Sequence, residues 1–417
     1  MTVTCTPSKL HGTLGILPSK SDAHRKFICA ALSENHTSAE FYLGADAECC
    51  EDILATVRCL EALGAAFSPD GIRTEISPIS REKSREYAKF DCGESGSTFR
   101  FMLPIAAALC ERTDFTGAGR LPERPISVLA DQMAAHGVTF SSQKLPFSTS
   151  GRLRGGMFEL PGNVSSQFLT GLMLALPLVA EDSEIRVTTP LQSEPYLDLT
   201  IHVLKQFGIE IITDRKDGLP RYRIRGNQIF SAPASISIDG DWSNAAFWLT
   251  ANALGSEINL TNLQPDSPQG DKQISSILRD FENAPSVMEI DMRQIPDLLP
   301  ILAVRAAFVN HETQFVHAER LRLKESDRLE TTAELIRGLG GRVTEHPDGL
   351  TIHGGGLVGG TVHAHNDHRL AMAAAIAATG CRESVRIIGA EAVKKSYPRF
   401  FECYQQLGGI CDGLDLR

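Results

Sequence analysis

One junction between helical and strand-like runs recurs along the chain. At this junction an amphipathic run stops at a glycine, and a short segment of β-branched or aromatic residues follows. Glycine is suited to a left-handed helix cap, a backbone conformation that costs more for a residue with a Cβ. Five copies stand at residues 61–67, 134–140, 205–211, 337–343 and 405–411.

The spacing of these junctions indicates a repeated α/β unit. Gly64, Gly137 and Gly208 stand 73 and 71 residues apart, and Gly340 and Gly408 stand 68 apart. Residues 279–290 occupy the place of a sixth copy, although that segment lacks the glycine. A period of about 70 residues is too long for common solenoids. Six such units fit two globular domains of three units each.

Several runs between these junctions predict buried helices and short strands. Four helical patterns are nearly apolar all round, as expected for helices inside a domain. Strand-like alternation occurs at 222–225 and 235–239. No Gly-x-Gly-x-x-Gly motif opens a helix after a strand, so a dinucleotide-binding fold has no support. The four helices span residues 97–110, 167–179, 245–254 and 369–378.

Length and composition fit an ordinary globular enzyme. The chain has 417 residues, 42% hydrophobic and 22% charged, and single cores stop growing near about 250–300 residues. The longest apolar run, residues 168–180, is too short to span a bilayer and ends at two acids. Because the first residues also lack the apolar core of a signal peptide, we expect a cytoplasmic protein. We also expect a monomer.

Charge and cysteine content exclude several partners. Lys and Arg total 41 against 51 Asp and Glu, a net charge of −10, so neither nucleic acid nor an anionic membrane is an expected partner. The ten cysteines show no metal-binding spacing, and we expect reduced thiols and no metal site. Against this acidic background, local clusters of Lys and Arg indicate a small anionic ligand.

Three segments place hydroxyl groups and cations at predicted helix starts, where backbone N–H groups bind anions. Each alone also fits an ordinary helix cap. In the third segment a cap accounts for one serine but leaves little use for the second serine and Gln167. The segments are LPSKSDAHRKF (17–27), CGESGSTFRFM (92–102) and GNVSSQFLTGL (162–172).

Three further segments cluster cations near proline, acids or histidine. Alone, they also fit a solvated loop, a salt-bridged surface helix and a structural histidine. All six segments together predict an enzyme that closes two domains around small anions. The segments are GAGRLPERPI (117–126), ERLRLKESDRLE (319–330) and HNDHRLAMAAAIAA (365–378).

Nine motifs in order carry a family resemblance. LPSKS with Arg25, GESGSTFR, LPERPI, VSSQFLT, SEPYLDLT, IPDLLP, LKESDR, NDHRLAM and KKSYP run from residue 17 to residue 398. In this order they resemble the 5-enolpyruvylshikimate-3-phosphate synthases. The resemblance implies an α/β fold of two similar domains, each of three βαβαββ units, in the inverse α/β barrel-like arrangement of enolpyruvyl transferases. It also implies a first domain of residues 1–16 and 238–417, a second of 17–237, and an active site in the cleft between them.

The resemblance also implies the substrates and their sites, with no metal or organic cofactor. The substrates are shikimate 3-phosphate and phosphoenolpyruvate. The implied shikimate 3-phosphate site comprises Lys20, Ser21, Arg25, Ser165, Ser166, Gln167, Ser193, Tyr196, Asp297, Arg320 and Lys324. The implied phosphoenolpyruvate site comprises Lys20, Gly96, Arg124, Gln167, Arg328, His368, Arg369 and Lys395.

The implied catalytic residues are Asp297, Glu325, Lys20 and Lys324. The 5-hydroxyl of shikimate 3-phosphate loses a proton as it attacks C2 of phosphoenolpyruvate, and Asp297 resembles the base. Glu325, assisted by Lys20, resembles the acid that protonates the methylene carbon, while Lys324 stands near the reacting hydroxyl. The tetrahedral intermediate then loses phosphate with proton flow reversed. A positioned acid or base of this kind contributes about 10²–10⁴-fold.

Three positions depart from the family pattern. The first motif lacks the usual glycine between Pro18 and Ser19, Glu94 replaces a common asparagine, and Arg320 replaces an asparagine that meets the shikimate phosphate. A carboxylate beside a phosphate is unfavourable unless a cation pairs with it, and Arg100 and Arg124 are the candidate partners of Glu94. The departures bear on substrate affinity and on sensitivity to glyphosate, although Gly96 is present.

Two alternatives remain open at this point. UDP-N-acetylglucosamine enolpyruvyl transferase resembles this chain in fold and donor, but it typically carries a cysteine acid in the loop that matches 117–124, where this chain has none. A non-catalytic anion-binding protein on the same fold is the second alternative. The paired carboxylates Asp297 and Glu325 weigh against it, since a pure anion receptor avoids acids in its site.

Overall fold

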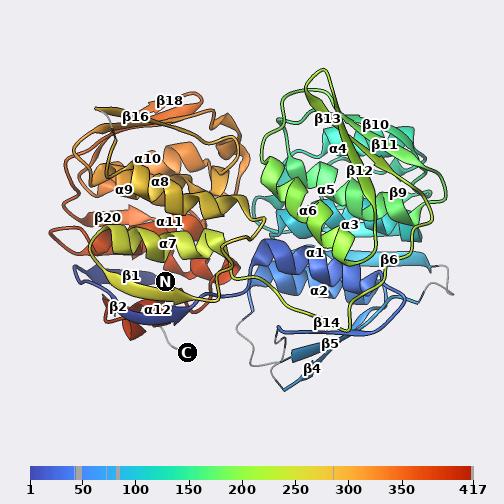
Figure 1. Cartoon of the computed structure of the whole chain (residues 1–417), viewed down its shortest axis with the longest axis horizontal. Coiled ribbons are helices and arrows are strands. Elements are labelled where there is room, and N and C mark those ends of the chain that lie inside the picture. Colours follow the sequence, from blue (N-terminus) through green and yellow to red (C-terminus); the bar gives the residue numbers. More distant parts are fainter. Residues whose placement is uncertain (42, 44–48, 72, 81–84, 285, 415–417) are drawn as a thin grey trace. The chain divides into compact units, whose positions relative to one another are not determined.

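The computed structural model describes residues 1–41, 43, 49–71, 73–80, 85–284 and 286–414. It divides into two compact units. The first unit combines Met1–Ser19 with Asp239–Arg417, and the second unit is Lys20–Ile238. In Figure 1 the second unit runs from blue to green, and most of the first unit runs from yellow to red. The two chain passages between the units start from one antiparallel bridge inside the first unit, between Pro18 and Gly240.

The described part of the second unit contains three four-stranded sheets and six α-helices. Their orders are β14-β3-β5-β4, β6-β7-β9-β8 and β10-β11-β13-β12. The strands are β3 (Thr37–Ala39), β4 (Ala66–Asp70), β5 (Arg73–Ser77), β6 (Arg85–Asp91), β7 (Cys110–Thr116), β8 (Thr139–Phe140), β9 (Phe147–Ser150), β10 (Gly156–Leu160), β11 (Ser183–Val187), β12 (Ile211–Lys216), β13 (Leu219–Ile224) and β14 (Ser235–Ile236). The helices are α1 (Lys20–Ala31), α2 (Glu51–Ala62), α3 (Gly96–Leu109), α4 (Ser127–Ala135), α5 (Ser166–Ala175) and α6 (Glu194–Gln206), with 3₁₀ turns η1 (Leu121–Glu123) and η2 (Leu176–Leu178).

The first unit repeats this plan over its described residues. Its sheets have the orders β16-β17-β19-β18, β20-β21-β1-β22 and β15-β2. The strands are β1 (Thr2–Thr6), β2 (His11–Gly15), β15 (Glu257–Thr261), β16 (Val287–Asp291), β17 (Glu312–Val316), β18 (Arg342–His346), β19 (Gly349–His353), β20 (Gly360–His363), β21 (Val385–Ile388) and β22 (Ile410–Asp412). The helices are α7 (Trp242–Ala253), α8 (Ile274–Asp280), α9 (Leu299–Ala307), α10 (Arg328–Gly338), α11 (His368–Ala378) and α12 (Phe400–Gln406), with 3₁₀ turns η3 (Gly270–Gln273), η4 (Pro296–Leu298), η5 (Glu319–Leu323) and η6 (Ala390–Lys395).

The pairing of the strands shows the repeated βαβαββ unit. In each four-stranded sheet, an outer strand pairs parallel with its neighbour, and the remaining pairs are antiparallel. The stretch β10-α5-β11-α6-β12-β13 is a complete βαβαββ unit in chain order, as is β16-α9-β17-α10-β18-β19. The five glycines predicted as helix caps all have positive φ, from +78° to +96°. The sixth segment, which lacks the glycine, runs from α8 into β16, and its residue 285 lies outside the described residues.

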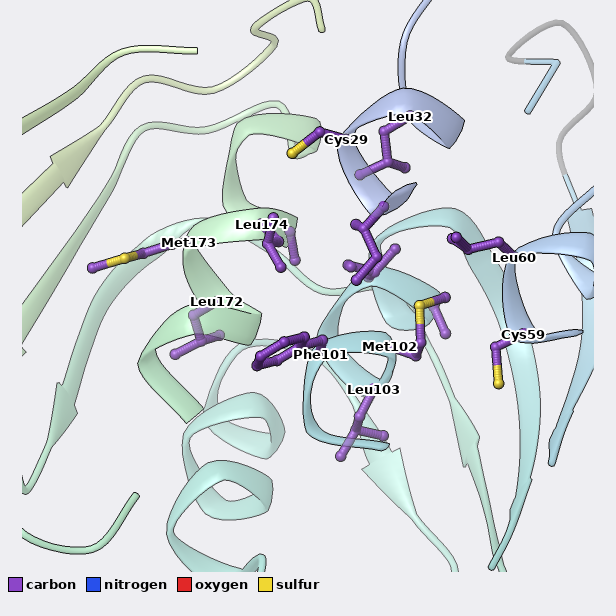
Figure 2. Packing of buried hydrophobic residues seen from close by; sticks show 14 of the residues in the cluster. Cys29, Leu32, Cys59, Leu60, Phe101, Met102, Leu103, Leu172, Met173 and Leu174 are labelled. Carbon is purple, nitrogen blue, oxygen red and sulfur yellow. The ribbon is translucent and has the colours of Figure 1, made fainter. Parts of the chain in front are cut away.

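The predicted apolar helices are the central helices of each unit. Every residue of α11 is buried, and α3, α5, α7 and α9 are buried over nearly their whole length. Figure 2 shows side chains of α2, α3 and α5 packed with Cys29 of α1 and with Leu32 just beyond it. In Figure 1 these helices lie between the strands of their own unit.

Several predicted boundaries shift by one to three residues, and two larger differences have a physical reason. Helix α5 ends at Ala175, and Pro177 continues the chain as a 3₁₀ turn because proline lacks the N–H that an α-helix uses. The predicted strand over 235–239 forms only the two-residue β14, since the chain then leaves its sheet toward Asp239 and the first unit. Among the described residues, no helix combines the length and apolarity needed to cross a membrane.

Candidate functional site

The second unit carries its candidate residues at helix starts. Lys20, Gly96 and Ser166 are the first residues of α1, α3 and α5, and Ser193 precedes α6. The first N–H groups of a helix lack partners within it and carry partial positive charge, so these starts attract anions. We call the candidates of this unit the anion set: Lys20, Ser21, Arg25, Gly96, Arg124, Ser165, Ser166, Gln167, Ser193 and Tyr196.

Arg25 joins the start of α1 to α6. Its guanidinium donates to the Ser21 carbonyl at 2.7 Å, to the Tyr196 carbonyl at 3.0 Å and to Thr200 Oγ1 at 2.8 Å. Burial lowers the pKa of Arg25 to about 10, still far above neutrality. The structure thus brings Ser21, Arg25 and Tyr196 together, with the arginine holding two helices in register.

Gln167 joins α5 to α3 in a similar way. Its Oε1 accepts from Arg100 Nη1 at 2.8 Å, and its Nε2 donates to Ser97 Oγ at 2.9 Å. Ser165 caps α5, because its Oγ accepts from the Gln167 N–H at 3.3 Å. Ser166 is buried but takes no part in that cap. One serine of the pair therefore has a structural task and the other does not.

Gly96 allows two guanidinium groups to approach the start of α3. An ideal Cβ on Gly96 would lie 2.6 Å from Arg124 Nη1 and 2.7 Å from Arg100 Nη1, closer than any side chain allows. Two cations and the N-terminal N–H groups of a helix then converge at one point, the arrangement expected for a phosphate or carboxylate. Arg100 belongs to this point although the predicted site residues did not include it.

Glu94 lies against the loop that carries Arg124. An ideal Cβ on Gly119 would lie 2.5 Å from the Glu94 carboxyl carbon, and Gly119 itself has φ +56°. The carboxylate is therefore turned toward the backbone of residues 117–124. The positive φ and the nearby Glu94 carboxylate both favour glycine at position 119, because a side chain there would be strained and would displace the carboxylate.

Lys20 is paired within the second unit. Its Nζ lies 2.7 Å from Asp52 Oδ2, in the first turn of α2, and both side chains are partly buried. Asp52 was absent from the predicted site, because nothing in the spacing of residues 20 and 52 shows that α1 and α2 start side by side. The ion pair holds the Lys20 ammonium group in one orientation.

The first unit centres its candidates on Arg328, whose side chain is only 1% exposed. The guanidinium binds three carboxylates: Asp297 at 2.8 Å, Glu325 at 2.6 Å and Asp367 at 2.9 Å. The pKa of Arg328 is raised, since these carboxylates, Asp367 foremost, outweigh the effect of burial. We call Asp297, Lys324, Glu325, Arg328, Asp367 and Arg369 the carboxylate network.

Asp297 contacts three cations of this network. Besides Arg328, it contacts Lys324 Nζ at 3.6 Å and Arg369 Nη2 at 3.2 Å. Burial lowers the pKa of Lys324 to about 8, and Asp297 opposes that shift. Asp297 thus lies among three cations. The two predicted catalytic carboxylates, Asp297 and Glu325, therefore share one guanidinium.

Asp367 is the fully buried carboxylate of the network. It is fully buried at the start of α11, where Oδ1 accepts from the Arg369 N–H at 3.0 Å and Oδ2 accepts from Ser326 Oγ at 3.1 Å. Sequence reasoning placed it inside a motif but gave it no role. The available signal was an aspartate one residue before an apolar helix, which is the pattern of an N-cap.

The remaining candidates of the first unit lie around the start of α11 and the end of η6. His368 is the first residue of α11 and is buried, and Lys395 Nζ donates to the Asn366 carbonyl at 2.8 Å. His365 and Asn366 both have left-handed backbones, with φ of +48° and +55°. Ser193 in the second unit also has a left-handed backbone, at φ +59°.

Two further charged residues interact with the network: Arg320 with Lys324, and Asp271 with Asp297. Arg320, in η5, is among the cations that lower the pKa of Lys324. Asp271 is 3% exposed, and burial together with Asp297 raises its pKa to about 6. Ser243 Oγ donates to Asp271 Oδ2. Sequence reasoning missed Asp271, since no motif marks it and only tertiary packing brings it near Asp297.

Comparisons with known proteins agree with one another. The family model described as EPSP synthase (3-phosphoshikimate 1-carboxyvinyltransferase) matches residues 5–403. The 3-phosphoshikimate 1-carboxyvinyltransferase of Clostridium perfringens is 40% identical over 99% of each chain. That of Clostridium acetobutylicum is 42% identical over 98% of this chain and 97% of its own.

Solved structures give the fold. The EPSP synthase structure from Acinetobacter baumannii at 2.37 Å matches with a TM-score of 0.78 and 22% identity, covering 99% of this chain and all of that one. A second structure of EPSP synthase from the same organism has a TM-score of 0.77 and 21% identity. The predicted fold class, a repeated α/β fold in two domains, is confirmed.

Proposed function

This chain belongs to the EPSP synthase family, and from that premise we propose that it transfers the enolpyruvyl group of phosphoenolpyruvate to the 5-hydroxyl of shikimate 3-phosphate. The products are 5-enolpyruvylshikimate 3-phosphate and phosphate, and the step serves the shikimate pathway toward aromatic amino acids. The proposal includes a monomer acting in the cytoplasm.

One observation carries the proposed mechanism: Arg328 holds Asp297 and Glu325 at 2.8 and 2.6 Å. Two carboxylates on one buried cation supply a base and an acid at a fixed separation. Asp297 takes the proton of the 5-hydroxyl as that oxygen attacks C2 of phosphoenolpyruvate. Glu325, assisted by Lys20, gives a proton to the methylene carbon, which becomes the methyl group of a tetrahedral intermediate.

The second half of the reaction reverses these transfers. A proton leaves the methyl group of the intermediate, the C–O bond to phosphate breaks, and the double bond re-forms. Phosphate departs with its electron pair and takes up a proton. Lys324 stays near the 5-oxygen, where an ammonium group stabilises the developing charge. Asp297 and Glu325 each exchange roles, so the enzyme returns to its starting protonation state.

We assign the candidate binding residues to the two proposed substrates. Ser165, Ser166 and Ser193 hold the phosphate of shikimate 3-phosphate, while Ser21, Arg25, Gln167, Tyr196 and Arg320 hold the rest of that substrate. Phosphoenolpyruvate is assigned to the cations Lys20, Arg124, Arg328, Arg369 and Lys395, with Gly96, Gln167 and His368 beside them. We assign both residue sets to one reaction, because the anion set contains no carboxylate that could exchange protons and the carboxylate network contains no hydroxyl group that could bind a phosphate.

The test is phosphate release by the purified chain. Phosphoenolpyruvate is supplied with shikimate 3-phosphate or with UDP-N-acetylglucosamine, and phosphate is followed continuously. We expect release only with shikimate 3-phosphate. Release only with the sugar nucleotide would assign the sister activity, which the lack of a cysteine in residues 117–124 disfavours. Release with neither acceptor would leave a binding protein on this fold.

A further inference from the structure

Four buried polar side chains of the second unit form a continuous hydrogen-bonded chain. His24 Nδ1 lies 2.7 Å from Thr56 Oγ1, which lies 2.7 Å from Thr98 Oγ1, which donates to Ser95 Oγ at 2.9 Å. Thr98 Oγ1 also lies 3.1 Å from the Asp52 carbonyl. We call His24, Thr56, Thr98 and Ser95 the polar chain. None of the four is more than 1% exposed.

Two of the three bonds in the polar chain join different helices, and the third lies within the N-terminal cap of α3. His24 belongs to α1, Thr56 to α2 and Thr98 to α3, while Ser95 is the N-cap of α3 and accepts from the Thr98 N–H at 3.2 Å. Figure 2 shows part of the apolar cluster that also packs these helices together, including Cys59, Leu60 and Met102. The polar chain therefore links α1, α2 and α3 by hydrogen bonds in addition to their apolar packing.

The direction of hydrogen-bond donation along the polar chain depends on the protonation state of His24. Burial lowers the pKa of His24 to about 3, so the imidazole is neutral and carries one N–H. Nε2 has no hydrogen-bond partner among the described residues. A proton on Nδ1 lets His24 donate to Thr56, Thr56 to Thr98, and Thr98 to Ser95 or the Asp52 carbonyl. The Thr56 and Thr98 hydroxyls then each accept one hydrogen bond and donate one.

Both ends of the polar chain reach residues of the anion set. His24 follows Lys20 by one helical turn, and the Asp52 residue whose carbonyl faces Thr98 also pairs with Lys20 through its side chain at 2.7 Å. At the other end, Ser95 directly precedes Gly96, the point where Arg100 and Arg124 approach α3. A bond network of fixed geometry thus connects the Lys20–Asp52 pair to the start of α3.

A purely structural histidine would not need this arrangement. An apolar side chain at position 24 would fill the same space against Phe101, whose ring lies edge-on at 6.2 Å, and it would avoid a buried nitrogen without a partner, which costs free energy. Apolar contacts let helices slide by fractions of an ångström, whereas hydrogen bonds between hydroxyls fix direction and distance. The retained polar chain is explained by a need for precise placement.

We propose that His24 is a positioning residue for phosphoenolpyruvate: through Thr56 and Thr98 it fixes the Lys20–Asp52 pair relative to the Gly96 end of α3. The inference rests on the proposed function for the identity of the ligand, but the placement itself is a property of the protein alone. In the proposed assignment the phosphate of shikimate 3-phosphate lies at the starts of α5 and α6, and among the described residues no hydrogen bond of the polar chain runs to those two helices.

The experiment compares four variants of the full chain in steady-state kinetics. His24→Leu and Thr56→Val break the polar chain. His24→Asn keeps a donor near the position of Nδ1. Thr113→Val is the matched control, since it removes a buried threonine–threonine bond, to Thr149, that joins β7 to β9 rather than helix starts. Thermal unfolding of each variant is recorded alongside.

We expect His24→Leu and Thr56→Val to raise KM for phosphoenolpyruvate about tenfold, because small misplacements of binding groups cost that much or more. KM for shikimate 3-phosphate should stay within about twofold, and His24→Asn should recover most of the loss. An unchanged KM for phosphoenolpyruvate in His24→Leu, an equal rise for both substrates, or the same loss in Thr113→Val would overturn the proposal.

A second readout separates this inference from the proposed function. If the unmodified chain releases no phosphate with either acceptor, the function fails, and amide hydrogen exchange still tests the placement. Exchange at residues 95–98 should be faster in His24→Leu and Thr56→Val than in the unmodified chain and unchanged in Thr113→Val. Unaltered exchange in the first two variants would show that the polar chain positions nothing.

Discussion

The two units use the same βαβαββ plan but place opposite chemistry at their helix starts. In the second unit, the starts of α1, α3 and α5 carry hydroxyl, amide and cationic groups, with Asp52 as the acid paired to Lys20. In the first unit, the segments before α9, α10 and α11 carry Asp297, Glu325 and Asp367, all bonded to Arg328.

This difference divides the work of the proposed reaction. Helix starts with neutral donors bind a phosphate without needing to change protonation. Carboxylates around a buried guanidinium are strongly coupled, so a proton that moves on one of them changes the electrostatics of the others. The repeat supplies equivalent helix ends, and the residue types at those ends decide between holding an anion and moving a proton.

The largest expected effect comes from removing the base. Asp297→Asn keeps the shape and some of the hydrogen bonds but cannot accept the hydroxyl proton, and we expect kcat to fall by about 10²–10⁴-fold. KM for both substrates should change far less. The exposed Asp280→Asn, on α8 of the same unit, is the control. A kcat within tenfold of the unmodified chain would remove Asp297 from proton transfer.

A second test compares the loss of stability when one acidic residue is removed from each unit. Asp367→Ala leaves Arg328, 1% exposed, without its fully buried partner, and breaking such a pair costs about 3–5 kcal/mol of unfolding free energy. Asp52→Ala leaves Lys20, 18% exposed, which can recover hydration. Urea unfolding should therefore show the larger loss for Asp367→Ala. Equal losses would mean that the carboxylate network is no more tightly coupled than the single pair.

The positions of the helix starts were predictable from sequence, because caps, glycines and apolar runs are local signals. The glycine junctions predicted left-handed caps, and Gly64, Gly137 and Gly208 have positive φ. The apolar run after Asp367 predicted a buried helix, and α11 is buried throughout. Local patterns also placed Ser165 and Ser166 at the start of α5.

The bonds between helix starts were not predictable, because they join residues far apart in sequence. Asp297 and Asp367 reach Arg328 from 31 and 39 positions away. Arg328 was assigned to phosphoenolpyruvate by its motif, and its task of holding three carboxylates emerged only from tertiary packing. The same holds for Asp52 and for His24, whose partner Thr56 lies 32 positions away.

A pH profile tests the contribution of a cation in the first unit, the Lys324 ammonium group. Burial lowers the pKa of Lys324 to about 8, so in the free enzyme the ammonium is present below pH 8 and is lost as the pH rises above it. We expect kcat/KM for shikimate 3-phosphate to fall about tenfold per pH unit above that value. Lys324→Arg keeps the charge and should abolish this alkaline limb. The same limb in both proteins would assign it to another group.

The smallest expected effects separate capping from ligand binding in the second unit. Ser165→Ala removes the acceptor for the Gln167 N–H and should cost about 1 kcal/mol of stability as well as raising KM for shikimate 3-phosphate. Ser166→Ala should raise that KM and leave stability unchanged, because Ser166 takes no part in the cap. Ser127→Ala, at the exposed start of α4 outside the anion set, is the control.

The informative quantity is the ratio of the two effects in each variant. A binding serine changes KM without changing the urea midpoint, whereas a capping serine changes the midpoint even without substrate. If Ser166→Ala lost stability and kept its KM, the start of α5 would be an ordinary helix end. The division between a unit that holds anions and a unit that moves protons would then rest on Lys20, Arg100 and Arg124 alone.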